Sequence, residues 1–147
     1  MPLRKNGCIE GVTFAFVRKG KILAEIRNRR NRSEIMIPSG IIEKSDAKNG
    51  DYRIAALKRE IREEMNVDAE EFVYLGKCRL RTRPLVMHVF LIKKWKGEIP
   101  SHTVENGKKD SRLVWFPLDE RYFVRYGSNF TCRKVLEYLK AGSSSKK

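Results

Sequence analysis

Residues 51–67 read DYRIAALKREIREEMNV, a stretch that combines a helical pattern with a dense group of acids. Its bulky apolar residues recur at steps of three and four, as they do along the buried stripe of a helix. These residues are Ile54, Leu57, Ile61 and Met65. Asp51 is a suitable N-cap, so the pattern predicts a helix from Asp51 to about Asn66.

Three carboxylates, those of Glu60, Glu63 and Glu64, lie beside the stripe on an arc of about 100°. Their spacing places like charges together at a cost of a few tenths of a kcal/mol each, a repulsion that a bound divalent cation removes. Oxygen ligands without a nearby histidine or cysteine pair favour Mg²⁺ or Mn²⁺. The alternative is a solvated helix face with an ion pair between Arg59 and Glu63.

The segments around this helix have the alternation and length of strands. A hairpin is predicted over residues 12–24, strands at 35–37, 72–75, 85–92 and 113–116, and a second helix over 128–139. We therefore expect an α/β fold in which a mixed β-sheet is sandwiched between α-helices. Residues 1–141 are expected to form a single domain, followed by a polar, disordered tail over 142–147.

The composition indicates the cellular compartment of the protein and the chemical class of its binding partners. Thirty-two Lys and Arg against 18 Asp and Glu give a formal net charge of +14, which favours a polyanionic partner such as a nucleotide or nucleic acid. The sequence shows no membrane-spanning run and no signal peptide, and its three widely spaced cysteines read as reduced thiols. We expect a cytoplasmic protein with no membrane partner; a homodimer is left open.

The segment from Arg59 to Val67 resembles the second half of the Nudix box, R-E-U-x-E-E-x-G-U, where U is a bulky apolar residue. It departs only at Asn66, which replaces the usual glycine, but asparagine also tolerates the left-handed conformation that ends a helix. The first half, usually a glycine and then, after five intervening residues, a glutamate, is matched by Gly40. Asp51 then stands in the glutamate position after an apparent insertion over 44–49, whose role the sequence leaves unexplained.

This resemblance to the MutT-like Nudix hydrolase family implies a Mg²⁺-dependent enzyme, with Mn²⁺ as an alternative ion, that hydrolyses a phosphoanhydride bond. It implies that Glu60, Glu63 and Glu64 bind the metal, that the Gly40 carbonyl completes the shell, and that Arg59 holds a glutamate in position. Family members differ in the location of their general base.

A box glutamate or an acid on the loop before Trp115 could act as that base. Asp110 lies five residues before Trp115, a spacing that resembles the loop acid of oxidised-nucleotide triphosphatases, and we favour it over Glu105. A solvated loop acid beside two lysines is the competing interpretation.

Arginine clusters are candidates for binding substrate phosphates. Arg79, Arg81 and Arg83 alternate with other residues and would share one face of an extended strand. Arg27 and Arg29 belong to a basic loop before the box. Protection of an edge strand is the alternative role. Aromatic residues that could stack on a base, or serve simply as core, are Trp95, Trp115, Phe116 and Tyr122, and His88 is expected to be structural.

The substrate expected is a nucleoside triphosphate, including oxidised forms, with release of pyrophosphate. ADP-ribose or another nucleotide sugar is the alternative, which Pro84 supports because hydrolases of that type tend to carry a proline near this position. The charge also keeps RNA binding or cap removal open, and a non-catalytic Nudix module is a further possibility.

Overall fold

The computed structural model describes residues 1–29, 32–48 and 50–145 of the 147-residue chain. Nine strands, two 3₁₀ helices and two α-helices follow one another within these residues. Their order is β1 (Arg4–Lys5), β2 (Cys8–Arg18), β3 (Lys21–Arg29), β4 (Arg32–Met36), β5 (Ser39–Ile41), η1 (Lys44–Lys48), α1 (Tyr52–Met65), β6 (Asp68–Arg79), β7 (Leu85–Lys96), β8 (His102–Glu105), β9 (Lys108–Pro117), η2 (Glu120–Tyr122) and α2 (Tyr126–Ser145).

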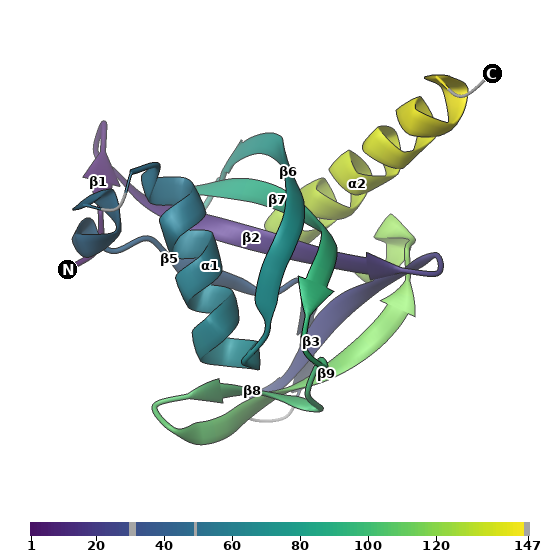
Figure 1. The fold of residues 1–147 in the computed structure, drawn as a ribbon, viewed down its shortest axis with the longest axis horizontal. Helices are drawn as coiled ribbons and strands as arrows, with labels where there is room; N and C mark the ends of the chain where they lie inside the picture. The colour runs from purple at the N-terminus through teal and green to yellow at the C-terminus, as the bar shows by residue number, and fades with distance from the viewer. Residues whose placement is uncertain (30–31, 49, 146–147) are drawn as a thin grey trace.

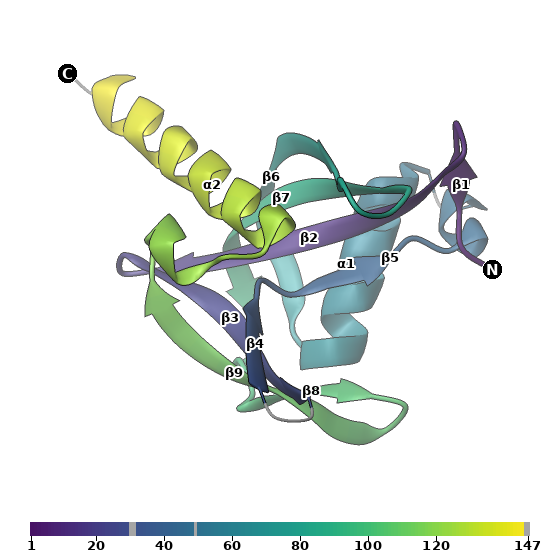
Figure 2. The same ribbon diagram turned by 180° about the vertical axis from the view of Figure 1, so that it is seen from behind.

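The strands form one curled, mixed sheet whose main path runs β6-β7-β2-β3-β9-β8. β2 and β7 pair in parallel, whereas β3 pairs antiparallel with both β2 and β9. The short strands β1 and β5 pair with β2, and β4 pairs with β3. α1 and α2 cover opposite faces of this sheet (Figures 1 and 2), which confirms the predicted α/β architecture.

β2 is buried on both faces because successive side chains of a strand point in opposite directions. Val12, Phe14 and Phe16 pack in the core beneath α1. Ala15 packs in the second core with Cys132 and Val135 of α2. The central strand therefore links the two hydrophobic cores.

The predicted hairpin and the predicted first helix are both present. β2 and β3 are joined at Lys19 and Gly20, whose φ angles of 52° and 74° suit a tight hairpin turn. The Asp51 side chain caps α1 by accepting from the Arg53 backbone N–H, and Asn66 ends the helix in the left-handed conformation with φ 55°. Asparagine therefore fills the helix-ending role that glycine usually has.

The predicted later strands coincide with β4, β6, β7 and β9, although the last three extend well beyond the predicted ranges. Strands β1, β5 and β8 have two to four residues each, too few to show a periodic pattern in the sequence. The three cysteines are free and buried.

α2 is longer than predicted and ends at Ser145, so the boundary placed at residue 141 falls inside the helix. Residues 142–145, expected in a disordered tail, continue the helix. Residues 146 and 147 lie outside the described residues. Within the described chain, no helix is both long enough and apolar enough to cross a membrane.

Candidate active site

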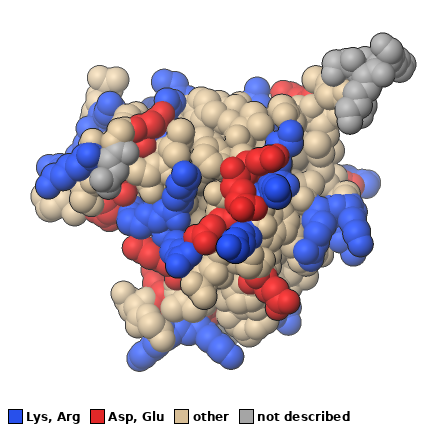
Figure 3. Space-filling view, in the orientation of Figure 1, with Lys and Arg blue, Asp and Glu red and all other residues tan. Residues whose placement is uncertain are grey.

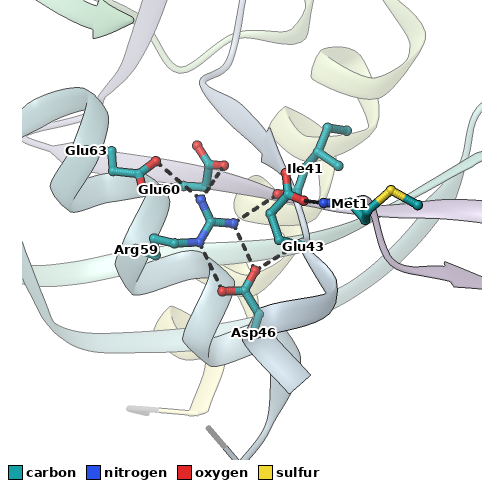
Figure 4. Close-up of polar contacts among 7 residues, drawn as sticks. All are labelled: Met1, Ile41, Glu43, Asp46, Arg59, Glu60 and Glu63. Carbon is teal, nitrogen blue, oxygen red and sulfur yellow. Dashed lines mark hydrogen bonds and ion pairs between the residues drawn. The ribbon is translucent and has the colours of Figure 1, made fainter. Parts of the chain in front are cut away.

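Arg59 lies at the centre of the polar contacts between α1 and the segment that precedes it (Figure 4). Its Nε and Nη2 atoms donate to the two carboxylate oxygens of Asp46, at 3.0 and 2.8 Å. Nη2 also donates to the Ile41 carbonyl at 3.1 Å. Nη1 donates to Glu60 and Glu63, at 3.0 and 3.2 Å. The expected pairing of this arginine with a glutamate is therefore observed.

Asp46 is the buried partner of Arg59, and its side chain is only 4% exposed. It belongs to η1, within the inserted segment, and it also accepts from the Glu43 backbone N–H at 2.8 Å. Burial raises the pKa of Asp46, but the hydrogen bonds from Arg59 and Glu43 outweigh this effect and hold the pKa below its usual value. Asp46 therefore remains ionised beside the guanidinium.

This geometry corrects the assignment of Asp51 to the acidic position of the first half-box. Asp51 caps α1 and pairs with Arg53, at 3.3 Å, and makes no contact with Arg59. Five residues separate Gly40 from Asp46, the spacing of the family motif, so the additional residues follow Asp46. The sequence allowed both placements, because each aspartate fits the motif when counted from one end.

Gly40, in β5, lies directly against the Glu60 carboxylate. A Cβ atom at position 40 would lie 2.3 Å from Glu60 Cδ, so no other residue fits while Glu60 keeps its position. The Glu60 side chain is 14% exposed, and burial raises its pKa. β5 and α1 thus bring together two of the residues assigned to the metal.

Glu64 is the most perturbed of the three box glutamates. Burial raises its pKa to about 9, and the charges of Glu60, Glu25 and Glu105 contribute to the rise. Its Oε2 atom is buried without a hydrogen-bond partner, alone in this respect among the buried side-chain oxygens and nitrogens of the described residues. A buried carboxylate oxygen of this kind is costly unless a proton or a cation neutralises it.

Glu25 faces α1 from the sheet and was missed in the sequence. It lies in β3, is only 4% exposed, and burial raises its pKa to about 7. Arg27, two residues along the strand, donates to Glu25 at 3.1 Å and to Ser111 at 3.2 Å. The available signal was a charged residue that interrupts the apolar run Ile22-Leu23-Ala24 before Ile26.

Asp110 lies in β9, not on the loop where it was expected. Its Oδ2 atom is 3.6 Å from Arg27 Nη2, and its side chain is 36% exposed. The loop is instead a tight turn between β8 and β9, where Asn106 and Gly107 have positive φ angles. Glu105 lies at the end of β8. Three acids from three strands, Glu25 of β3, Glu105 of β8 and Asp110 of β9, therefore lie near one another.

The row of three arginines predicted on one strand face is not present. β6 ends at Arg79, and Arg81 and Arg83 lie in the turn before β7 because Pro84 has no N–H for a strand ladder. The Arg81 guanidinium lies 4.8 Å from the centre of the Tyr126 ring at the start of α2. Arg29 ends β3, and its side chain lies outside the described residues.

His88 takes part in a separate buried cluster beneath the start of α1. Its Nε2 atom is 2.8 Å from Glu10 Oε1, and its Nδ1 atom is 2.9 Å from the Tyr74 hydroxyl. Tyr52 also donates to Glu10, at 3.4 Å. These contacts satisfy the buried polar atoms from within the protein, the arrangement expected of a structural histidine.

Within the described residues, no three histidine, cysteine, aspartate or glutamate side chains are close enough to hold a metal ion as they stand. Glu60 and Glu63 bind Arg59 instead. The donor chemistry nevertheless fits a hard divalent cation, because every candidate ligand is an oxygen and the buried Oε2 atom of Glu64 has no other partner.

Comparison with solved structures gives the same fold. A MutT Nudix hydrolase from Burkholderia pseudomallei matches with a TM-score of 0.66 and 22% identity over 86% of this chain and 96% of that one. An ADP compounds hydrolase matches with a TM-score of 0.73 and 16% identity, over 90% and 74%. The Nudix domain of Shewanella oneidensis NrtR, solved with ADP ribose, matches with a TM-score of 0.63 and 14% identity, over 92% and 90%.

Comparison with curated proteins gives no significant match. The family model of the NUDIX domain, by contrast, matches residues 11–137, most of the chain. This range begins within β2, contains α1 and the box glutamates, and ends within α2. The chain therefore belongs to the Nudix family of pyrophosphohydrolases.

Proposed function

We propose that this Nudix hydrolase uses Mg²⁺ to cleave a nucleoside triphosphate, including oxidised forms, with release of pyrophosphate. Mn²⁺ is the alternative ion. The observation that carries the proposal is the partly buried Glu64 carboxylate, which has one buried oxygen without a partner and interacts electrostatically with Glu60 and Glu25. Carboxylates grouped in this way are costly in a folded protein unless a proton or a cation neutralises them.

Glu60, Glu63, Glu64 and the Gly40 carbonyl are the groups that we assign to the metal. When bound, the ion lowers the pKa of a ligated water and neutralises charge on the phosphate oxygens. Arg59 fixes the position of Glu60 by holding it together with the buried Asp46. Gly40 leaves the space that Glu60 needs.

Asp110 is the residue that we assign as the general base. Its carboxylate is partly exposed and can therefore reach a water molecule, and Arg27 Nη2 lies 3.6 Å from its Oδ2 atom. We also assign Arg27 to a substrate phosphate. Arg27 pairs with Glu25, and a bound cation would share the neutralisation of Glu25, so the guanidinium could then contact the phosphate. Arg29, at the end of the same strand, is assigned the same role.

A second candidate substrate is ADP-ribose or a related ADP compound. Two of the similar folds carry names that point to it, an ADP compounds hydrolase and a Nudix domain solved with ADP ribose. Pro84 lies between β6 and β7, and its carbonyl accepts from the Ile9 backbone N–H, which gives this proline a structural role of its own.

The test is a substrate panel in the presence of Mg²⁺: nucleoside triphosphates, oxidised nucleotides, ADP-ribose and dinucleoside polyphosphates. Phosphate, pyrophosphate and nucleoside monophosphate are measured for the protein, for Glu63→Gln, and for the exposed surface control Glu98→Gln. We expect triphosphate turnover with pyrophosphate release, lost by at least about a hundredfold in Glu63→Gln and retained in Glu98→Gln.

Turnover of ADP-ribose alone would replace the first candidate with the second. No turnover of any compound in the panel would contradict both candidates, and capped RNA would then be the next substrate to test.

A further inference from the structure

The chain has two tryptophans, and they lie side by side at one end of the sheet. Trp95 of β7 and Trp115 of β9 have ring centres 6.3 Å apart with an interplanar angle of 24°. Phe16 meets the Trp95 ring edge-on at 5.0 Å. Both tryptophans are only half-buried, so part of their ring surface is available to a ligand.

Cations of the β2–β3 turn lie beside this aromatic pair, on the side of Trp115. The Arg18 guanidinium lies 4.6 Å from the centre of the Trp115 ring and 6.0 Å from that of Trp95. Arg18, Lys19, Lys21 and Trp115 line a pocket of about 350 Å³. Pockets of roughly 300–1,000 Å³ hold small ligands in other proteins.

The charges of this turn are not neutralised by acids. Arg18, Lys19 and Lys21 are exposed, and within the described residues none of the three forms an ion pair. Figure 3 shows Lys and Arg side chains gathered over this end of the molecule, on the right. An anionic ligand would relieve the repulsion among them.

The pocket is separate from the box glutamates. β2 pairs with Gly40 of β5 at Val12 and turns into β3 after Arg18. Six residues along a strand correspond to about 20 Å. A ligand at the turn therefore has no direct contact with the residues assigned to the metal.

We propose that this tryptophan pocket is a second binding site, which takes a nucleoside phosphate. The base stacks on the indole of Trp115 in place of the Arg18 guanidinium, and the freed guanidinium, with Lys19 and Lys21, binds the phosphate. Arg18 can move because it is exposed and sits next to a tight turn. Stacking on aromatic rings beside a basic groove is the general mode by which proteins hold single-stranded nucleic acid without sequence preference.

Intrinsic fluorescence provides a direct test, because both tryptophans of the chain lie at the proposed site. The protein is titrated in EDTA, which prevents metal-dependent turnover, with inorganic phosphate, AMP and a short single-stranded oligoadenylate. We expect AMP and the oligoadenylate, but not phosphate alone, to quench the emission. Quenching by AMP at a similar concentration identifies a free nucleotide as the ligand, whereas at least tenfold tighter binding of the oligoadenylate identifies a strand.

Charge-matched variants separate this site from general attraction to a basic protein. Arg18→Gln/Lys21→Gln removes two charges at the turn, and Lys48→Gln/Lys77→Gln removes two exposed charges elsewhere. We expect binding to weaken about tenfold or more in the first double variant and less than twofold in the second. Turnover should be unchanged in the first double variant, and Glu63→Gln should retain the quenching.

No change in emission with any nucleotide would overturn the proposal. An equal loss of binding in the two double variants would also overturn it, since the charge of the whole protein would then account for the attraction.

Discussion

Arg59 connects η1 with α1, two parts of the chain that are separate in the sequence. One side of the guanidinium holds Asp46 of η1, and the other holds Glu60 and Glu63 of α1. Five such contacts fix the plane of the guanidinium, which a lysine could not reproduce because its ammonium lacks the planar fork. The orientation of the box glutamates therefore depends on an aspartate outside the helix.

Asp46→Asn tests this dependence. The substitution leaves the Arg59 guanidinium, which is 27% exposed, without its buried counter-charge. We expect a loss of about 2 to 3 kcal/mol in the free energy of unfolding, measured by urea denaturation, and a fall in kcat of about tenfold or more. Asp51→Asn is the matched control, and it should be nearly neutral because asparagine caps a helix as well as aspartate.

Equal destabilisation by the two substitutions would mean that Asp46 contributes no more to the free energy of unfolding than the helix cap Asp51 does. Stability loss without any change in kcat would restrict the aspartate to a structural role.

The buried acids predict a distinctive dependence of stability on pH. The pKa values of Glu25 and Glu64 are raised from 4.5 to about 7 and about 9, so the folded metal-free protein binds more protons than the unfolded chain between these values. The free energy of unfolding should therefore be largest below about pH 4.5 as far as these two groups are concerned. It should fall as pH rises, by at most about 1.4 kcal/mol per pH unit for each group.

Urea denaturation in EDTA across this pH range measures the effect. Glu64→Gln should flatten the fall because the amide cannot ionise, and added Mg²⁺ should restore stability at high pH because it binds the ionised carboxylates. A metal-free protein that becomes more stable between about pH 5 and about pH 8 would contradict this description of the two acids.

At the scale of elements, the site depends on the close contact of β5 with α1. The strand has only three residues, and it is positioned by pairing with β2 at Gly11, Val12 and Thr13. Glu60 then fills the space beside Gly40. A short strand without a periodic pattern thus determines where a proposed metal ligand lies.

Gly40→Ala should separate these elements, because the added Cβ would lie 2.3 Å from Glu60 Cδ. We expect Mn²⁺ affinity, measured by calorimetry or electron paramagnetic resonance, to fall by about tenfold or more, with a comparable loss of kcat. Gly142→Ala is the control, since a Cβ added at that position would meet no heavy atom within 4 Å outside its own stretch of helix. Unchanged Mn²⁺ affinity in Gly40→Ala would exclude Gly40 and Glu60 from the metal site.

The sequence predicted α1 and its ends well because the apolar stripe, the N-cap and the terminal asparagine are all local signals. It placed the acidic half-box position incorrectly because an insertion can be counted from either end. It also wrongly placed Arg79, Arg81 and Arg83 on one strand face. Side chains alternate between faces only within a strand, and β6 ends at Arg79. Glu25 was missed because its burial in the folded sheet is a tertiary feature, to which residues distant in the chain contribute.

At the scale of the whole molecule, one long central strand organises both proposed sites. β5 and α1, which carry the proposed metal ligands, lie toward one end of β2, and the β2–β3 turn lies at the other end (Figure 1). The tryptophan pocket is lined by residues at that turn. The layered architecture could be predicted from the sequence, because it follows from the alternation and helical stripe of each segment. The strand order could not, since the parallel pairing of β2 with β7 joins residues that are distant in the chain.

That parallel pairing also has a consequence for how the protein folds. Ile9 of β2 lies opposite Leu85 of β7, so more than half of the chain separates the two partners. The entropy of closing so large a loop must be overcome before any of the contacts between these strands form. During synthesis, β2 therefore waits without its central partner until β7 has left the ribosome, and its apolar edge stays exposed to other chains for that interval.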